Sequence, residues 1–439
     1  MEGEKKRDGR RISIIREFAS NTSTHALPGI ARSESIHNRV FWSISFISFT
    51  AIMIYFVVEA ILAYFEYPTQ MNVSYNSEWP QYFPAFSLCN ASPFRFDRFI
   101  EPFLNFTNTH NLTNTNDTTT LSALQASYLW NFIVDRINRN ESMEPFFYSL
   151  SSMLYTCTFN SQPCSAADFI SFTSSTYGLC YTFNAKLKNS SNDSVRYGHE
   201  NGGTGKLNLG LYVHSHQYVP HIEDSIGMVV QVHDNTQLPR IEAAGIELST
   251  GRKHKLSYTK KTVYFPSSPY TACTDKLSLS MKLMFDNYNG ADYGYLGLIC
   301  YENQYCFECS DQCSIIDFLV QASSLIAPVP WQMDDIKRFV ENSTIPLPEN
   351  WSTTWHEHIH ANYLAVDVVR ETNIVENNTQ TPTLTPVDVL SNIGGQTGLW
   401  IGISFLSIME VIEMFYRLIR YECNVVQRAK QRKQQIVPK

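Results

Sequence analysis

Two long apolar segments interrupt a chain whose remaining parts mix apolar and polar positions. They cover residues 40–64 and 389–418, with few charges in either. A helix rises about 1.5 Å per residue and the hydrocarbon core of a bilayer is about 30 Å thick, so each segment is long enough to cross a membrane. We therefore expect two transmembrane helices at these positions, with a large domain at 65–388 between them.

The second apolar segment has an unusual composition. Four glycines fall between residues 394 and 402, and two acids, Glu410 and Glu413, follow them. Glycine lets a backbone approach its neighbours closely or leave the helix, and an acid at membrane depth is costly unless it faces water or ions. This combination predicts a pore.

The distribution of basic residues predicts the orientation. Residues 1–39 carry eight Lys or Arg and residues 417–439 carry seven, out of thirty-four in the chain. Because positively charged flanks favour the cytoplasmic side, we expect cytoplasmic tails at 1–39 and 419–439. The domain at 65–388 is then extracellular.

The content of residues 65–388 agrees with an oxidising, extracellular location. Nine of the ten cysteines lie there, and the tenth is Cys423. Eleven N-x-Ser/Thr sequons also lie there and predict a glycoprotein. The sequon asparagines are Asn72, Asn90, Asn105, Asn111, Asn116, Asn140, Asn189, Asn192, Asn342, Asn350 and Asn377.

The net charge of −7 conceals an asymmetry between the parts of the chain. Without the fifteen basic and nine acidic residues of the tails and spans, 19 basic and 32 acidic residues remain, a net charge of −13. Such a field concentrates cations. The basic tails are short and adjacent to the membrane, so they do not indicate nucleic-acid binding.

Histidines offer a candidate for proton sensing. All of the twelve except His25 and His37 lie in the predicted extracellular domain. His356, His358 and His360 alternate, and alternate residues of a strand share a face, so we expect them to titrate together near neutral pH or to hold a metal. His214 and His216 form a similar pair.

No catalytic motif is present: the sequence lacks G-x-S-x-G, H-E-x-x-H and a phosphate-binding loop. We expect neither an enzyme nor a cofactor. The four cysteines between 300 and 313 could be read as a zinc site, but irregular spacing in a secreted context favours disulfides. A non-conducting adhesion receptor or auxiliary subunit remains an alternative, although neither needs a broken helix followed by acids.

Five motifs occur in order along the chain: FPAFSLCN (83–90), CTFNSQPCSAADF (157–169), GLCYTFN (178–184), FPSSPYTAC (265–273) and GGQTGLWIGISFLSIMEVIE (394–413). Together they resemble the degenerin/epithelial sodium channel/acid-sensing ion channel family. The resemblance implies an α+β membrane protein in which three subunits surround a pore, each with a β palm, a β-ball, and a helical finger and thumb. Only 39 residues separate Cys273 from Cys313, so the thumb is short.

The resemblance also implies roles for residues of the pore. The selectivity filter is Gly402-Ile403-Ser404, where a broken helix exposes carbonyls to a wet cavity. Glu410 and Glu413 would form acidic rings beyond it. The gate corresponds to Ser391, with Gly394 and Gly395 three and four residues later.

Further implied sites lie outside the filter. His25 and Ala26 match the family's N-terminal His-Gly gating motif, in a re-entrant segment under the pore. Because Ala replaces Gly comfortably only at negative φ, we expect a different turn or a helix there. Tyr67 and Tyr270 match aromatic residues that couple the extracellular domain to the gate.

The resemblance implies the disulfides Cys89–Cys180, Cys157–Cys164 and Cys273–Cys313. Of Cys300, Cys306 and Cys309, one pair at most can form. We expect Cys300–Cys309, and which of the three is unpaired stays open.

The expected function is a sodium-selective channel of the plasma membrane, sensitive to amiloride-type blockers and built as a homotrimer or as a heterotrimer with related subunits. Its expected partners are sodium ions and the lipid bilayer. We expect extracellular protons to gate or modulate it. The alternatives are gating by a short amidated peptide and a constitutively open pore.

Overall fold

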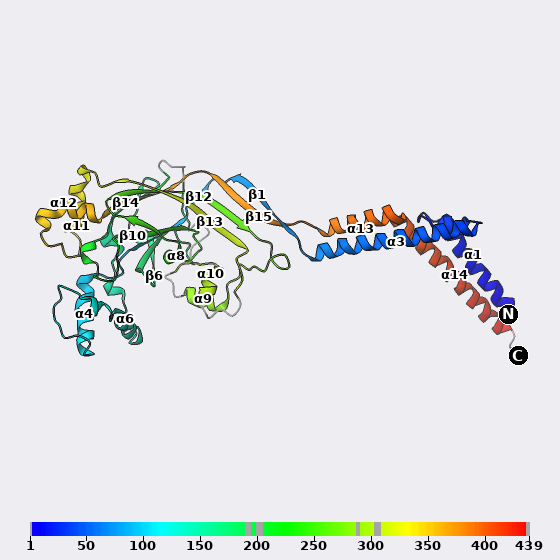
Figure 1. Ribbon diagram of the computed structural model, residues 1–439, viewed down its shortest axis with the longest axis horizontal. Coiled ribbons are helices and arrows are strands. Elements are labelled where there is room, and N and C mark those ends of the chain that lie inside the picture. Colours follow the sequence, from blue (N-terminus) through cyan, green and yellow to red (C-terminus); the bar gives the residue numbers. More distant parts are fainter. Residues whose placement is uncertain (1, 189–194, 199–204, 287–289, 303–308, 436–439) are drawn as a thin grey trace. The chain divides into compact units, whose positions relative to one another are not determined.

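The computed structural model describes residues 2–188, 195–198, 205–286, 290–302 and 309–435 (Figure 1). The chain forms two compact units. Unit 1 combines the two ends of the sequence, Met1–Gln70 and Thr381–Lys439, and unit 2 is Met71–Gln380.

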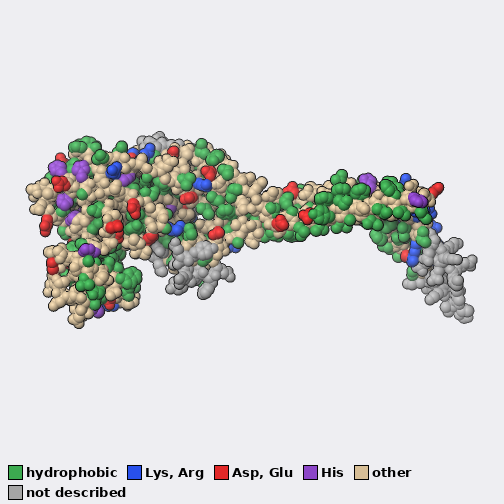
Figure 2. Space-filling model, viewed as in Figure 1, with side chains coloured by type: hydrophobic (Ala, Val, Ile, Leu, Met, Phe, Trp, Pro, Cys, Tyr) green, Lys and Arg blue, Asp and Glu red, His purple; other side chains and the backbone are tan. Residues whose placement is uncertain are grey.

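Unit 1 is helical. One of its helices, α3, is long and apolar enough to cross a membrane by itself, and none of its most apolar window is buried. The pair α13 and α14 meets the same criterion only if taken together, across a bend of 71°. Figure 2 shows hydrophobic side chains along these helices. The helices are α1 (Glu2–Asn21), α2 (Leu27–Arg32), α3 (Ile36–Phe65), α13 (Pro386–Ile401) and α14 (Phe405–Gln435).

Aromatic and ionic contacts hold these helices together. The Trp400 ring of α13 stacks on Phe49 and Phe56 of α3, with centroids 6.0 and 6.1 Å apart. Glu17 of α1 pairs with Arg417 of α14 at 3.1 Å, and Arg11 pairs with Glu422 at 2.6 Å between the same helices. The sequence reasoning treated these terminal parts as tails, with a re-entrant segment at His25 and Ala26. It did not foresee α1, nor that α14 continues to Gln435.

Unit 2 is built around two sheets. A mixed eight-stranded sheet has the order β1-β15-β12-β14-β9-β4-β5, with β13 also paired to β12, and a five-stranded sheet has the order β11-β10-β3-β7-β6. The strands are β1 (Thr69–Ser77), β2 (Gln81–Tyr82), β3 (Ala85–Asn90), β4 (Leu154–Phe159), β5 (Gln162–Pro163), β6 (Phe169–Ser174), β7 (Gly178–Phe183), β8 (Tyr197–Gly198), β9 (Leu207–Tyr212), β10 (Gly227–His233), β11 (Ile246–Ser249), β12 (Arg252–Tyr264), β13 (Ser314–Ile326), β14 (Tyr363–Arg370) and β15 (Ile374–Pro382).

The apolar pattern explains the central strands. Every residue of β14 is buried, as expected for a strand with partners on both edges and both faces covered. From the sequence alone, the apolar run at 363–369 predicts this strand. In β12, buried and less buried residues alternate through much of the strand, the pattern of one covered face. Phe83, Leu209 and Val366 belong to the main core, which draws on both sheets.

Helices surround these sheets. Aromatic residues at helical spacing on α4, including Phe99 and Phe103, form a separate core with Phe132 of α6. Figure 1 shows α4 and α6 together, and α11 and α12 beside one end of the large sheet. The helices are α4 (Phe96–Thr109), α5 (Ala123–Ala126), α6 (Leu129–Asn138), η1 (Glu144–Phe146), α7 (Leu150–Met153), η2 (Ala166–Asp168), η3 (Ser215–Gln217), α8 (Ile241–Ala244), α9 (Leu279–Asp286), α10 (Gly297–Glu302), η4 (Pro330–Gln332), α11 (Met333–Glu341) and α12 (Trp351–Asn362).

The described part of unit 2 contains the disulfides Cys89–Cys180, Cys157–Cys164, Cys273–Cys313 and Cys300–Cys309. The resemblance implied the first three, and the fourth is the pair that we expected among the remaining cysteines. Three cysteines of the 300–313 cluster are therefore bonded and cannot serve as zinc ligands, while Cys306 lies outside the described residues.

The predicted strand through His356, His358 and His360 is wrong, because these residues belong to the helix α12. Trp351 and Ile359 are buried and eight residues apart, which matches two helical turns. The alternating histidines drew attention away from this eight-residue spacing. On a helix, His356 and His360 are four residues apart and lie on one face, whereas His358 points in a different direction, so the three do not share a face.

The sequon at Asn90 is also incompatible with glycosylation of the folded chain. Asn90 is 2% exposed, and its amide nitrogen donates to the Val213 carbonyl at 3.0 Å. A glycan at this atom would remove that bond and would not fit. Asn189 and Asn192 lie outside the described residues, and the other eight sequons stay predictions.

Candidate functional site

The candidate site is the interruption between α13 and α14. The helix α13 ends at Ile401, Gly402 has a φ of +68°, and α14 begins at Phe405. Glycine adopts this left-handed conformation without a side-chain clash and commonly ends helices. The Gly402 and Ile403 amides bond back to the Gly398 and Thr397 carbonyls at 3.1 and 3.2 Å. The helix therefore closes with satisfied carbonyls before residues 402–404, where the sequence placed the filter.

Residues 22–25, called the N-terminal segment below, contact this interruption directly. The His25 amide donates to the Ile401 carbonyl at 2.8 Å. A Cβ built on Gly402 would lie 2.6 Å from Nδ1 of His25, closer than real contacts allow. Residue 402 must therefore be glycine both for its φ and for the histidine ring that covers it.

A serine that sequence reasoning missed joins the two segments. Ser407, 1% exposed, shares a hydrogen bond of 2.6 Å with the Ser23 hydroxyl. Its Oγ also accepts the Ser404 amide at 3.1 Å and lies 3.3 Å from the Gly402 carbonyl. The spacing of Ser404 and Ser407 is typical of the start of a helix, and it was the one signal in the sequence that could have pointed to Ser407. Ser407 thus links the N-terminal segment to residues 402–404.

Glu410 is engaged by the same segment. Its Oε2 accepts the Thr22 hydroxyl at 2.8 Å and the Ser23 amide at 2.9 Å. Glu410 and Glu413 line a hollow of about 240 Å³ together with Glu17 and residues of both α1 and α14. Sequence reasoning assigned these two acids to rings in the pore and did not foresee the contact of Glu410 with Thr22 and Ser23.

Ala26 departs from our expectation. It has a φ of +69° and a ψ of −31° and precedes α2. We expected alanine to require negative φ, but here an alanine occupies the region that favours glycine. Such strain costs about 1–3 kcal/mol per residue and persists only where the surroundings impose it. The contacts of residues 22–25 supply that restraint.

The predicted gate residues lie on an uncovered face of α13. Ser391, Gly394 and Gly395 are exposed. In the described part of the chain, a Cβ added at Gly394, Gly395 or Gly398 would meet nothing within 4 Å. Residues at these spacings share one face of a helix, so α13 presents a stripe of small residues to its surroundings.

The predicted coupling between Tyr67 and Tyr270 stays a prediction. Tyr67 belongs to unit 1, with a φ of +50°, and its ring lies 6.2 Å from that of Tyr64. Tyr270 belongs to unit 2, where its amide donates to the Ser267 carbonyl at 3.3 Å.

Of the two histidine groups that the sequence suggested, the structure brings together the pair His214 and His216. His214 and His216 have ring centroids 5.8 Å apart. Burial lowers the pKa of His214 to about 3, and burial, aided by His358, lowers the pKa of His216. Nδ1 of each ring lacks a hydrogen-bond partner within the described residues. Figure 2 shows histidines near the end of unit 2 that carries α11 and α12.

The geometry fits the passage of a small cation better than the catalysis of a covalent reaction. An interrupted apolar helix, with backbone oxygens at the break and carboxylates one to three turns beyond, can replace part of an ion's hydration shell. Among the described residues, no group of three or more His, Cys, Asp or Glu is placed to hold a metal.

Comparison with known proteins assigns the chain to a family. The family model described as amiloride-sensitive sodium channel matches residues 18–292 and 296–414. Acid-sensing ion channel 1 of Gallus gallus is 26% identical over 454 aligned residues, which cover 93% of this chain and 84% of the relative. Acid-sensing ion channel 1C of Danio rerio is 24% identical, with the same coverage of both chains. The gamma subunit of the epithelial sodium channel of Neoceratodus forsteri is 25% identical and covers 63% of this chain and 47% of the relative. The chain belongs to the amiloride-sensitive sodium channel family.

Proposed function

We propose that the chain is a subunit of a trimeric, sodium-selective plasma-membrane channel that amiloride-type blockers close and extracellular protons modulate. Both tails are cytoplasmic, and α3 with the α13–α14 pair forms its two spans. Gly402, Ile403 and Ser404 are the filter, and Glu410 and Glu413 supply negative charge beyond it. The observation that carries the proposal is the break at 402–404, held by residues 22–25.

The exposed stripe on α13 supports a pore made by several copies. Small residues at Ser391, Gly394, Gly395 and Gly398 leave one helix face open along about two turns. Membrane helices use such faces to approach one another closely. Three copies that meet along this face would place residue 391 at the narrowest point and the break beyond it.

Proton modulation is supported by the relatives named acid-sensing ion channels and by unit 2. His214 and His233 are buried, and burial holds their pKa at about 3 and about 4. Acidification therefore acts against the folded arrangement around these rings. His214 and His216, rather than the residue 356–360 group, are the favoured sites.

Recording currents from cells that express the full chain tests the proposal. We expect a current that follows the sodium gradient, is blocked by amiloride and changes between pH 8 and pH 5. If the current does not change over this pH range but appears when an amidated peptide is added, the stimulus is a peptide and not protons. A chloride-carried current would overturn the proposed function.

A further inference from the structure

Unit 2 contains an apolar cavity that the proposed pore does not use. Its volume is about 630 Å³, and it lies between α6 and the β6–β7 hairpin. Trp130 and Ile133 form the α6 wall, Thr173 and Leu179 lie on the hairpin, and Phe147 also lines it. Ligand cavities usually measure about 300–1,000 Å³ and have mostly apolar walls with a few polar groups.

The side chains at the cavity explain why it is not filled. Trp130 is 70% exposed although it lies beside an apolar hollow. Phe132, two residues later, points to the opposite face and is 1% exposed in the core with α4. Because α6 buries one face against α4, it leaves Trp130 and Ile133 available to a ligand.

The charge on the cavity wall itself is negative. Among the described residues that line the cavity, Glu144 is the one that ionises. Glu242 accepts the Ser174 hydroxyl at 2.6 Å and the Ser175 amide at 3.2 Å, and both serines line the cavity. Glu223 follows the lining residue Ile222, and burial raises the pKa of Glu223, with Asp224 adding to the effect.

Basic residues of α6 do not offset this charge. Arg136 pairs with Glu141 at 3.1 Å, and Arg139 pairs with Asp135 and, at 3.0 Å, with Glu141. Neither arginine lines the cavity, and Arg136, which also donates to the carbonyl of the lining residue Ser142 at 3.0 Å, is neutralised by Glu141. A ligand in the cavity therefore meets apolar walls and a negative potential, which favours a cation and disfavours an anion.

We propose that this cavity binds a small organic cation with an aromatic or branched aliphatic body. The body packs against Trp130, Ile133 and Phe147, and the ammonium or guanidinium group approaches Glu144. A cation over the tryptophan face gains further attraction from the ring.

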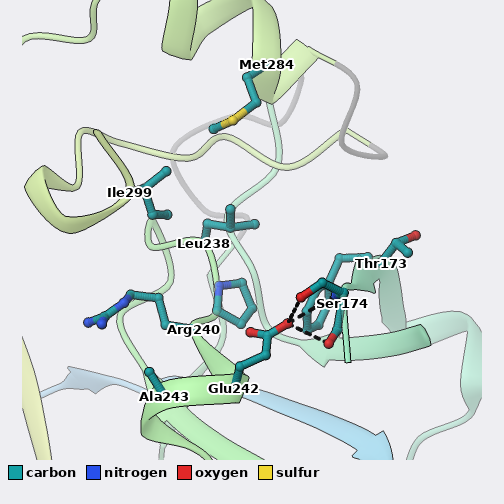
Figure 3. A pocket seen from close by; sticks show the side chains of 11 residues that line it. Thr173, Ser174, Leu238, Arg240, Glu242, Ala243, Met284 and Ile299 are labelled. Atoms are coloured by element: carbon teal, nitrogen blue, oxygen red, sulfur yellow. Dashed lines mark hydrogen bonds between the residues drawn. The ribbon is translucent and has the colours of Figure 1, made fainter. Parts of the chain in front are cut away.

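Occupancy of the cavity would also reach a second hollow. Thr173, Ser174 and Ser175 line both the cavity and a neighbouring hollow of about 450 Å³ (Figure 3). In that hollow, Glu242 of α8 holds Ser174, and Met284 of α9 and Ile299 of α10 complete the wall. The hairpin is thus a shared wall through which a bound cation alters α8, α9 and α10. That this changes current rests on the proposed function.

Cysteine protection on the intact full chain tests the site without any current. Ile133→Cys is introduced where Cys306 and Cys423 are serine, and a membrane-impermeant maleimide labels the cell surface. The probes are tryptamine, neutral tryptophol and anionic indole-3-acetate, which share one ring system. At about 1 mM we expect tryptamine to slow labelling about threefold or more, as a dissociation constant of about 0.5 mM or below gives. The other two should protect less.

Matched variants make the result specific. Glu144→Gln should remove the preference for tryptamine, whereas Glu101→Gln, on the exposed face of α4, should keep it. Leu124→Cys, 63% exposed and outside the cavity, should show no protection. Thr173→Cys repeats the comparison from the opposite wall if Ile133→Cys does not reach the surface. Equal protection by the three probes would overturn the cationic assignment, and absence of protection by all of them would overturn the site. Because labelling needs no current, this outcome is independent of the proposed function.

Discussion

Ser407→Ala should alter ion selection while leaving the channel assembled. The change removes one buried oxygen that contacts Ser23 at 2.6 Å, Ser404 at 3.1 Å and Gly402 at 3.3 Å. A hydroxyl has one donor and two acceptor sites, so up to three bonds are lost. Of these contacts, the Ser23 bond is the one that joins the N-terminal segment to Ser407, and one bond contributes about 0.5–1.5 kcal/mol, which corresponds to about a twofold to tenfold shift toward release of that segment.

The assay is the reversal potential with sodium outside and potassium inside, together with single-channel conductance. If Ser407 positions the carbonyls of residues 402–404, Ser407→Ala should shift the reversal potential toward that of a non-selective pore. Ser407→Thr keeps the hydroxyl and should restore much of the selectivity. Ser48→Ala makes the same chemical change at an exposed position of α3 and should have no effect.

A purely structural role predicts a different result. Loss of stability would reduce the number of channels at the surface and therefore the total current, but not the reversal potential. Wild-type selectivity and conductance in Ser407→Ala, at normal surface expression, would refute the positioning role.

Five further substitutions test other parts of the proposal. Ser391→Phe should raise steady current, because a large side chain cannot fit where copies meet along α13; a silent mutant at normal surface levels would contradict this. Glu410→Gln and Glu413→Gln should each lower cation conductance or sodium preference, and unchanged sodium preference in both would exclude the acidic ring. Ala26→Gly should raise the thermal midpoint of the purified channel, since a left-handed alanine costs about 1–2 kcal/mol; a lower midpoint would contradict this. His214→Asn should reduce the acid sensitivity of that midpoint, because Asn tolerates the local φ of +54° and does not titrate in this range. The folded pKa of His214 is about 3 and the unfolded value about 6.5, so the unfolded state binds more protons between these two values. Stability therefore falls as the pH falls, by about 2 kcal/mol at pH 5. An unchanged difference between pH 7 and pH 5 would exclude His214 as its source.

Local patterns in the sequence predicted the elements whose causes are local. The apolar segment at 40–64 lies within α3, and the strand at 363–369 is β14. The helix α12 was misread because histidine alternation was weighed above the spacing of Trp351 and Ile359. Polar residues at every second position favour a strand only if the apolar residues follow the same period.

Contacts across the chain were out of reach for a different reason. The Ser23–Ser407 bond joins residues separated by 384 positions, and the Thr22–Glu410 bond joins residues separated by 388. Neither the residues around Thr22 and Ser23 nor those around Ser407 show a periodicity that would indicate their partners. The resemblance suggested a segment under the pore, but the atoms that hold it follow only from the folded arrangement.

Backbone strain at Ala26 affects how readily the N-terminal segment leaves its contacts with α13 and α14. Gly402 and Ala26 both have φ near +70°. The His25 ring covers Gly402, and the His25 amide donates to the Ile401 carbonyl at the end of α13. Glycine bears this conformation freely, whereas alanine stores energy in it. The docked state is therefore held by Ser23, Ser407 and Glu410 against a local cost at residue 26. A strained element held by a few hydrogen bonds releases more readily than an unstrained one, so Ala26 favours undocking and the buried serine opposes it. Combining Ala26→Gly with Ser407→Ala should consequently restore part of the selectivity lost in Ser407→Ala alone, and an additive worsening would show that the two residues do not act on one equilibrium.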